Sequence, residues 1–325
     1  MQGTMECLPA CPVFLYPKIG KEDCFIMNMI LQILVYGLQL GSTYALLALG
    51  YSMVYGIVGM INFAHGDLLM VGAYTAFFIF AAFDTTPTNL VIIVGVIILT
   101  MVIVGAIGAF IEKVAYKPLR NKARLSALIT AIGVSMFIEN FPRALPFIGP
   151  NARSFPSIIP TKVIQLGSIN VTTIQLVTIG TAVVLMIVLD LFVNHTIYGK
   201  QMRAVQQNKD ASSLMGISVN RIISLTFFLG AALAAVSGIL YASTYPTITL
   251  TMGSTLGMKA FICAVLGGIG DIRGAMLGGF VLGIAEMYAN YINADFSYGI
   301  SFIILILVLI LRPQGLVGKE TVEKV

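Results

Sequence analysis

LVIIVGVIILTMVIVGAIGAFI, residues 90–111, contains no Asp, Glu, Lys or Arg and decides the class of fold. A transmembrane helix needs roughly 20 mainly apolar residues, and a second uncharged stretch runs from Val171 to Leu189. Of the 325 residues 58% are apolar and 10% are charged, and the mean hydropathy of +0.94 excludes a soluble domain. The runs are too long and uniform for barrel strands, which alternate lipid-facing and lumen-facing residues. The sequence therefore predicts an all-α membrane protein, a polytopic helical bundle.

Basic residues cluster in three stretches between the apolar runs, namely Lys113–Arg124, Lys200–Arg221 and Arg312–Lys324. By the positive-inside rule these stretches are cytoplasmic. Threading the apolar runs between them predicts ten crossings, or about eight if the short segment 256–270 and part of 25–66 do not span. The ten lie at 25–41, 44–60, 66–83, 90–111, 125–141, 173–193, 222–243, 256–270, 274–291 and 297–311. Both termini are then cytoplasmic, and the loop at 142–172 lies outside.

The expected transmembrane domain covers 27–318, with a cytoplasmic loop at 198–221 and a cytoplasmic tail at 319–325. Residues 1–26 lack the basic region and cleavage site of a signal peptide. They are either a short disordered tail or an over-extended start, with Met27 or Met29 as the first residue. The net charge is +5, and the basic residues lie next to the apolar runs. This distribution indicates the lipid bilayer as a partner and no nucleic acid.

The stretch NFAHGD, residues 62–67, places polar side chains inside a long apolar run. One interpretation is a wet cytoplasmic turn between two helices. The other is a break in a helix whose freed backbone groups and polar side chains line a solute pathway. The two are compatible at the inner mouth of a pathway. We therefore take Asn62, His65, Gly66 and Asp67 as candidate pathway residues.

Four charged residues lie in or near the predicted crossings, namely Glu139, Asp190, Lys259 and Glu286. Charge at membrane depth is a functional hypothesis by default, although snorkelling or a headgroup contact suffices near helix ends. Glu286 lies in the outer half of its segment, and we add it to the candidate pathway residues.

The cytoplasmic stretch 198–216 is long, polar and rich in helix formers, and it ends at a glycine. It fits either an interfacial helix with its basic residues on lipid phosphate or a helix that docks into a groove of a partner protein. The glycines of 267–279 do not form a phosphate-binding loop, because no strand precedes them and no Lys-Ser or Lys-Thr follows. Gly274, Gly278 and Gly279 are expected to allow close helix packing.

Catalytic chemistry finds no support in the sequence. The sequence contains no P-loop, and His and the four cysteines do not have the spacing of metal ligands. It also offers no combination of nucleophile, base and orienting group. We therefore expect neither an enzyme, nor a metal site, nor a bound nucleotide in this chain.

Several stretches resemble one known family, the membrane permeases of bacterial ATP-binding-cassette importers for branched-chain amino acids, and in particular the first of the two permease subunits. The likeness runs from about residue 30 to the C-terminus through NFAHGD at 62–67, EKVAYKP at 112–118, AVLGGIG at 264–270 and the closing VEKV at 322–325. The 198–216 loop resembles the coupling motif of such permeases, Glu-Ala-Ala, three residues, then Gly. Here the motif reads Asp210-Ala211-Ser212 and Gly216, so an aspartate replaces the leading glutamate and a serine the second alanine.

The resemblance implies a short helix inserted into an ATPase subunit, with ATPase coupling assigned to Arg203, Asp210, Ala211, Ser212 and Gly216. It implies alternating access in the bacterial inner membrane and transport of leucine, isoleucine and valine. The implied partners are a second homologous permease, two ATPase subunits that bind ATP and Mg²⁺, and an extracytoplasmic binding protein. Other amino acids, urea or short amides are alternative substrates, and an ion-coupled secondary transporter is the alternative from another class.

Overall fold

The computed structural model describes residues 21–82, 90–120, 122–167 and 169–318, so the tail at 319–325 and residues 1–20 of the predicted N-terminal tail lie outside the described residues. The helices are α1 (Lys21–Val58), α2 (His65–Ala81), α3 (Leu90–Ile111), α4 (Arg124–Asn140), α5 (Thr173–His195), α6 (Ile197–Gln207), α7 (Lys209–Leu214), α8 (Val219–Thr244), α9 (Met252–Gly267), α10 (Ile272–Ile292) and α11 (Ala294–Leu311). A π-helical turn (Glu112–Tyr116) and a 3-10 turn (Lys117–Leu119) follow α3, and another 3-10 turn (Phe141–Ala144) follows α4. The strands are β1 (Arg153–Ser154), β2 (Val163–Leu166), β3 (Ile169–Thr172) and β4 (Thr247–Ile248).

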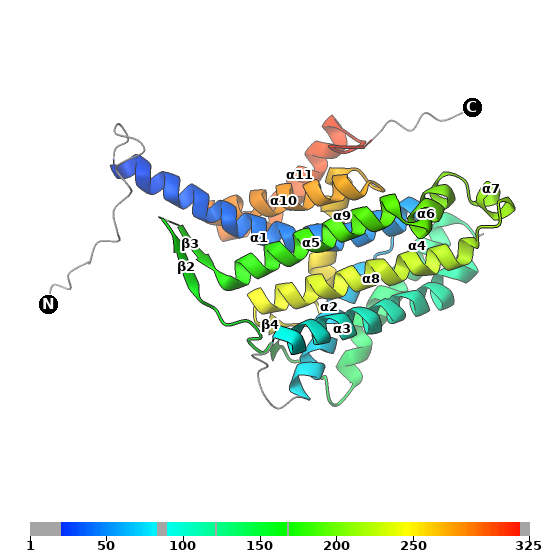
Figure 1. Ribbon diagram of the computed structural model, residues 1–325, viewed down its shortest axis with the longest axis horizontal. Helices are drawn as coiled ribbons and strands as arrows, with labels where there is room; N and C mark the ends of the chain where they lie inside the picture. The colour runs from blue at the N-terminus through cyan, green and yellow to red at the C-terminus, as the bar shows by residue number, and fades with distance from the viewer. Residues whose placement is uncertain (1–20, 83–89, 121, 168, 319–325) are drawn as a thin grey trace.

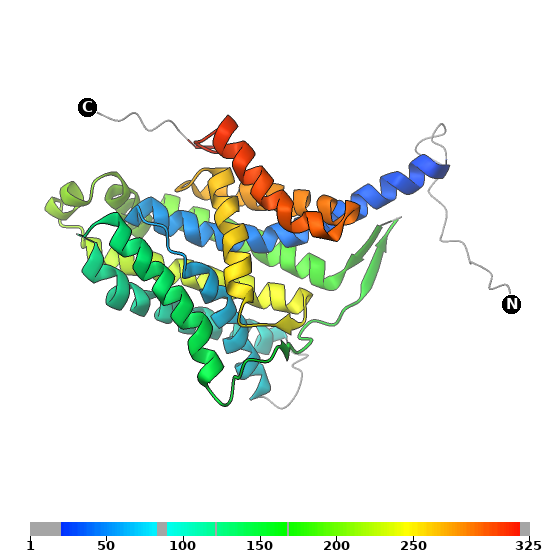
Figure 2. The same ribbon diagram turned by 180° about the vertical axis from the view of Figure 1, so that it is seen from behind.

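The described part of the chain is a helical bundle, which confirms the predicted fold class. Seven helices are long and apolar enough to cross a membrane, namely α1, α3, α4, α5, α8, α10 and α11. Two shorter apolar helices, α2 and α9, pack among them. Figure 1 shows α1, α3, α5, α8 and α10 running along the long axis, and Figure 2 shows α9, in gold, lying across this direction.

The predicted crossings at 25–41 and 44–60 are wrong, because both belong to the single helix α1. Ser42 and Thr43, at the expected break, satisfy their hydroxyls within the helix by donating to the carbonyls of Leu38 and Leu40, each at 2.7 Å. Gly41 is not a turn residue, because a Cβ there would lie 2.9 Å from the Cα of Phe280 on α10. The small and polar residues at 41–43 therefore reflect close helix packing and not a turn. The described part of the chain holds nine apolar helices, whereas the sequence predicted ten.

α1 is much longer than one crossing requires. Its 38 residues span about 57 Å at 1.5 Å per residue, against about 30 Å of hydrocarbon. The helix starts at Lys21, inside the stretch that the sequence assigned to a tail, and its first turns lie at the end of the bundle opposite α6 and α7 (Figure 1). The cytoplasmic placement of both termini stays a prediction.

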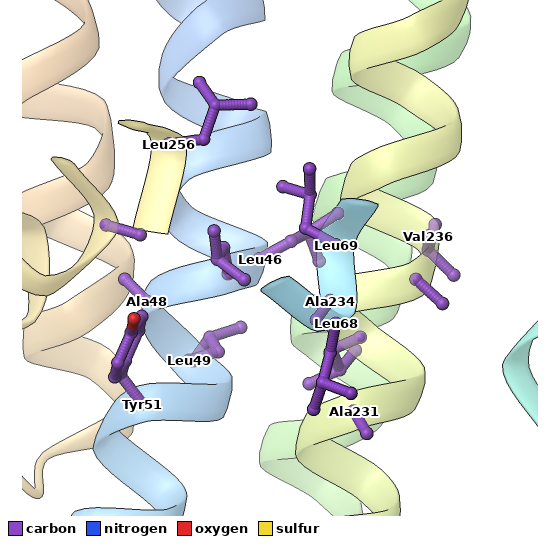
Figure 3. Close-up of a cluster of buried hydrophobic side chains, with 14 of the residues drawn as sticks. Leu46, Ala48, Leu49, Tyr51, Leu68, Leu69, Ala231, Ala234, Val236 and Leu256 are labelled. Carbon is purple, nitrogen blue, oxygen red and sulfur yellow. The ribbon is translucent and has the colours of Figure 1, made fainter. Parts of the chain in front are cut away.

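The core forms where α1, α2, α8 and α9 meet. Figure 3 shows buried side chains of one hydrophobic cluster, which includes Leu46, Leu68, Ala234 and Leu256 from these four helices. In the most apolar stretches of α1 and α8, 78% of the residues are buried, against 11% in α4 and α11. α4 and α11 therefore present their apolar side chains to the surroundings of the subunit.

Small residues set the helix spacing, as predicted for Gly274, Gly278 and Gly279. A Cβ on Gly279 would lie 2.5 Å from the Cα of Ala45 on α1. The positions of a Cβ on Gly274 and Gly278 would overlap the carbonyl groups of Gly267 and Cys263 on α9. α10 therefore packs closely against both α1 and α9, which brings their polar side chains within reach of one another.

Short strands organise the long loop between α4 and α5. β2 and β3 form an antiparallel hairpin, and β1 pairs antiparallel with β4, which follows α8. The hairpin is tied to α1, because Gln32 donates to the carbonyl of Asn170 at 2.9 Å and accepts from its amide at 3.0 Å. This loop and the first turns of α1 thus form one end of the molecule.

Candidate functional site

The stretch 62–67 is buried where α2 begins inside the bundle. α1 ends at Val58 and is followed by Gly59, which has a φ of +76°. Asn62, His65 and Asp67 are at most 3% exposed. The interpretation as a wet turn is therefore wrong for these side chains. Gly66 marks the crossing of α2 over α9, because a Cβ there would lie 2.5 Å from the Cα of Gly257.

We call this region the α2–α9 crossing, defined as His65, Gly66 and Asp67 with Gly253 and Gly257 of α9. The His65 ring meets the Tyr51 ring edge to face, with the ring centroids 4.7 Å apart. Within the described residues, Nε2 of His65 and both carboxylate oxygens of Asp67 have no hydrogen-bond partner. The cavities described below are lined by other residues. The candidate pathway residues here lie in packed protein, and their assignment to a pathway stays a prediction.

Asn62 is held by the π-helical turn after α3. Tyr116 Oη donates to Asn62 Oδ1 at 2.5 Å in a buried hydrogen bond. In the same turn the fully buried Glu112 forms an ion pair with Arg120 and accepts from the hydroxyl of Ser224 on α8 at 2.5 Å. Sequence reasoning did not select Glu112, although an acid eight residues before an arginine in a basic stretch was a usable signal.

The predicted coupling loop folds into α6 and α7. Asn208 caps α7, because its side-chain oxygen accepts from the amides of Asp210 and Ala211 at 3.0 and 2.9 Å. Asp210 and Ala211 are exposed, whereas Ser212 is 5% exposed and donates to the carbonyl of Asn208 at 2.7 Å. Ser212 thus stabilises α7 from within the loop.

The chain leaves α7 at Gly216, whose φ of +82° favours glycine. Just before it, Leu214 and Met215 are 89% and 82% exposed. Two large apolar side chains at the tip of a projecting helix indicate a contact surface, because such side chains gain by burial against another molecule.

Arg203 does not belong to the exposed surface of α7. Its guanidinium donates to the carbonyl of Val193 and to Asn194 Oδ1, the latter at 3.3 Å, and so holds α6 against the end of α5. α6 and α8 border a groove of about 660 Å³ lined by Phe192, Tyr198, Gln201, Gly216, Ser218, Arg221, Ile222, Leu225 and Leu229. Of the five coupling candidates, Arg203 therefore anchors the loop to the bundle.

Lys209 connects α7 to α1. Its ammonium donates to the carbonyl of Val58 at 2.9 Å, at the last turn of α1, where a cation is favourable. Partial burial, and to a lesser extent the nearby charge of Arg120, lowers the pKa of Lys209 from its ordinary value. Lys209 thus links α7 to the end of α1.

Glu286 lies apart from the α2–α9 crossing and forms a second buried polar region. It is 6% exposed, forms an ion pair with Lys259 of α9, and accepts a hydrogen bond from Tyr44 Oη of α1 at 3.0 Å. These groups border a cavity of about 160 Å³, called here the charged cavity. It is lined by Leu40, Tyr44, Tyr241, Tyr245, Lys259, Glu286, Met287, Asn290, Ser297 and Tyr298.

The sequence analysis named both Glu286 and Lys259 as charges near predicted crossings, but it took only Glu286 as a pathway candidate and did not predict their pairing across two helices. The signal was the presence of two opposite charges in neighbouring apolar segments. In the part of the chain that the structure describes, no group of three His, Cys, Asp or Glu side chains could hold a metal ion.

A family model described as "Branched-chain amino acid transport system / permease component" matches residues 33–309. The chain belongs to this family. The permease is 43% identical over 302 residues to the "High-affinity branched-chain amino acid transport system permease protein LivH" of Salmonella typhimurium, a match that covers 91% of this chain and 97% of that one. It is 40% identical over 305 residues to the corresponding protein BraD of Pseudomonas aeruginosa, covering 91% and 98%.

More distant relatives include a probable LivH of Methanocaldococcus jannaschii, 28% identical over 85% of the permease and 88% of that protein. A solved structure, PsaBC from Streptococcus pneumoniae in complex with Fab, covers 89% of the permease and 92% of its own chain, with 14% identity and a TM-score of 0.40, which is too low to support an argument. The resemblance expected from the motifs is confirmed. The permease is a multi-pass membrane component of a transport system and not an enzyme.

Proposed function

We propose that this permease carries leucine, isoleucine and valine across the bacterial inner membrane as one of two homologous permease subunits of an ATP-binding-cassette importer. An extracytoplasmic protein delivers the substrate, and two ATPase subunits bind ATP and Mg²⁺. The support is the 43% identity to LivH along almost the whole of both chains. Alternating access follows if nucleotide and substrate each favour a different state of the permease.

In this proposal the end of the bundle that carries α6 and α7 faces the cytoplasm. The basic residues of 200–221 support this orientation through the positive-inside rule. The hairpin of β2 and β3 and the start of α1 then face outward, where the binding protein docks.

α7 is the proposed ATPase contact. The observation that carries this assignment is its exposed tip, with Leu214 and Met215 at 89% and 82% exposure, on a helix anchored to α1 by Lys209. When the ATPase subunits close on ATP, they move α7, and α1 and α8 move with it. Arg203 holds the base of the loop on α5 during this movement.

Gly216→Asp tests the coupling. A side chain at a φ of +82° is strained and the new charge lies beside the exposed tip, so we expect binding-protein-stimulated ATP hydrolysis to fall about ten-fold while the bundle stays folded. Gly149→Asp is the matched control, because Gly149 also has a positive φ, of +69°, and open space around it, but lies in the outer loop. Normal stimulation in Gly216→Asp would favour a helix that lies on lipid headgroups instead.

The substrate is tested with the complex reconstituted in liposomes. Leucine, isoleucine and valine should stimulate ATP hydrolysis and accumulate when presented with the binding protein, and urea should do neither. Accumulation of leucine by the purified chain alone in an ion gradient would overturn the importer and favour a secondary transporter.

A further inference from the structure

The charged cavity lies in the half of the bundle that the proposed orientation turns outward. Glu286 lies nearer the end of α10 than its start, Tyr245 follows α8, and Ser297 lies in the first turn of α11. The cavity of about 160 Å³ is roughly ten times the volume that a single water needs. Unlike the α2–α9 crossing, this polar region has room for a small molecule.

Its two charges are largely shielded from solvent and can form further hydrogen bonds. The side chains of Lys259 and Glu286 are 12% and 8% exposed. In the described residues the Lys259 ammonium, which has three N–H donors, donates only to Glu286. Glu286 accepts one bond from Lys259 and one from Tyr44, and each carboxylate oxygen can accept another. Both groups can therefore bind a ligand while they keep part of their mutual contact.

Helix packing alone gives a weak reason for this pair. Burying two opposite charges costs more than burying apolar side chains of the same size, and the desolvation penalty often exceeds the attraction. α10 already packs closely against α1 and α9 through Gly278 and Gly279. Charges at membrane depth beside a cavity therefore indicate a ligand of matching charge.

The remaining lining combines four tyrosines and two aliphatic side chains with the polar residues Asn290 and Ser297. Leu40 and Met287 offer aliphatic surface, and the Lys259 ammonium lies 4.9 Å from the centroid of the Tyr298 ring and 5.8 Å from that of Tyr44. Tyrosine rings pack against aliphatic groups and attract cations. Tyr298 is 63% exposed and stands at the edge of the cavity. A zwitterion with a short apolar side chain matches the paired charges, and Leu40, Met287 and the tyrosine rings offer contacts to its side chain.

We propose that the charged cavity binds the transported amino acid during passage, with Glu286 accepting hydrogen bonds from its ammonium group and Lys259 donating to its carboxylate. The aliphatic side chain packs against Leu40, Met287 and the tyrosine rings. This inference rests on the proposed function and adds a site within the permease to the selectivity supplied by the binding protein.

The experiment uses the full complex in liposomes, with leucine-loaded binding protein as the probe, and measures leucine uptake and ATP hydrolysis together. The variants are Lys259→Met and Glu286→Gln. The controls are Arg143→Met and Glu139→Gln, which alter an exposed ion pair between the end of α4 and the 3-10 turn that follows it. Uptake should fall about ten-fold in both cavity variants while stimulated ATP hydrolysis stays within about two-fold, because docking and ATPase coupling are intact. The controls should match the wild type.

Three results would overturn the site. Uptake could stay normal, or uptake and hydrolysis could fall in parallel with loss of the assembled complex. The double variant with Lys259→Glu and Glu286→Lys could restore full uptake, which would mean that only the ion pair between helices matters. A wild-type complex that carries urea would overturn the proposed function and the site together, whereas an active wild type with unaffected variants would overturn the site alone.

Discussion

The α2–α9 crossing and the charged cavity are both buried, both polar and about two turns apart along α1, where Tyr51 contacts the first and Tyr44 the second. They differ in free space. At the crossing, glycines allow the helix backbones to pack in direct contact, which leaves no free space. Polar atoms of His65 and Asp67 there have no hydrogen-bond partner among the described residues. At the cavity, the opposite charges of Lys259 and Glu286 pair directly and border about 160 Å³ of space. Burial and residue type alone do not distinguish packing from binding, whereas room for a ligand and complementary charge do.

The largest expected effect comes from filling the crossing. Gly66→Ala places a methyl group 2.5 Å from the Cα of Gly257, which must move backbone atoms of α9. Overpacking costs about 1–3 kcal/mol or more, so we expect most of the protein to be lost from the monodisperse peak in size-exclusion chromatography. Gly180→Ala on α5, where nothing lies within 4 Å, should behave as the wild type. A well-folded Gly66→Ala would mean that the crossing has unused space.

The next test applies the same isosteric change to both regions. Glu286→Gln should reduce leucine uptake about ten-fold, because the amide loses the charge that attracts both Lys259 and the substrate ammonium. Asp67→Asn should leave uptake within about two-fold and should not lower thermal stability, because an amide is easier to bury than a carboxylate. Equal losses of uptake in the two variants would break the comparison and make the crossing part of the pathway.

A smaller effect is expected at the segment that leads into the crossing. Tyr116→Phe removes the donor to Asn62 and leaves a buried oxygen unpaired, at a cost of about 1–3 kcal/mol. The melting temperature in detergent should fall and uptake at low temperature should persist. Tyr74→Phe is the control, because the buried Tyr74 hydroxyl has no partner among the described residues, so its removal should leave the melting temperature unchanged.

The smallest effect is expected from a charge pair outside both regions. Arg143→Ala breaks the contact with Glu139 on α4, where the side chains are 40% and 21% exposed. Exposed pairs at this spacing contribute about 0.3–0.5 kcal/mol, so the melting temperature should change by less than in Tyr116→Phe. A larger change in the melting temperature would show that this exposed ion pair contributes to stability and is not a suitable control for Lys259 and Glu286.

The sequence predicted most crossings closely. The apolar runs at 90–111, 173–193 and 274–291 correspond to α3, α5 and α10 within two residues at each end. The error at 41–44 has a tertiary cause, because only the contact of Gly41 with α10 distinguishes a packing glycine from a turn glycine. Hydropathy indicates whether a segment can cross the membrane, but it does not indicate which helix the segment packs against.

The candidate site was harder to predict, for the same reason. NFAHGD drew attention because its polar residues are adjacent in the chain, whereas Lys259 and Glu286 are separated by 27 residues and meet only when α9 packs on α10. Glu286 was found from its depth in the membrane. Its pairing with Lys259 and the cavity beside the pair could be identified only from the folded structure.

α1 connects the two ends of the molecule. It has no proline, and its helix continues without a gap from Lys21 to Val58. One end is pinned to the hairpin through Gln32 and the other to α7 through Lys209. Tyr44 lies about 21 Å along α1 from Val58, so in the proposed orientation one continuous helix joins the contact with α7 to the charged cavity.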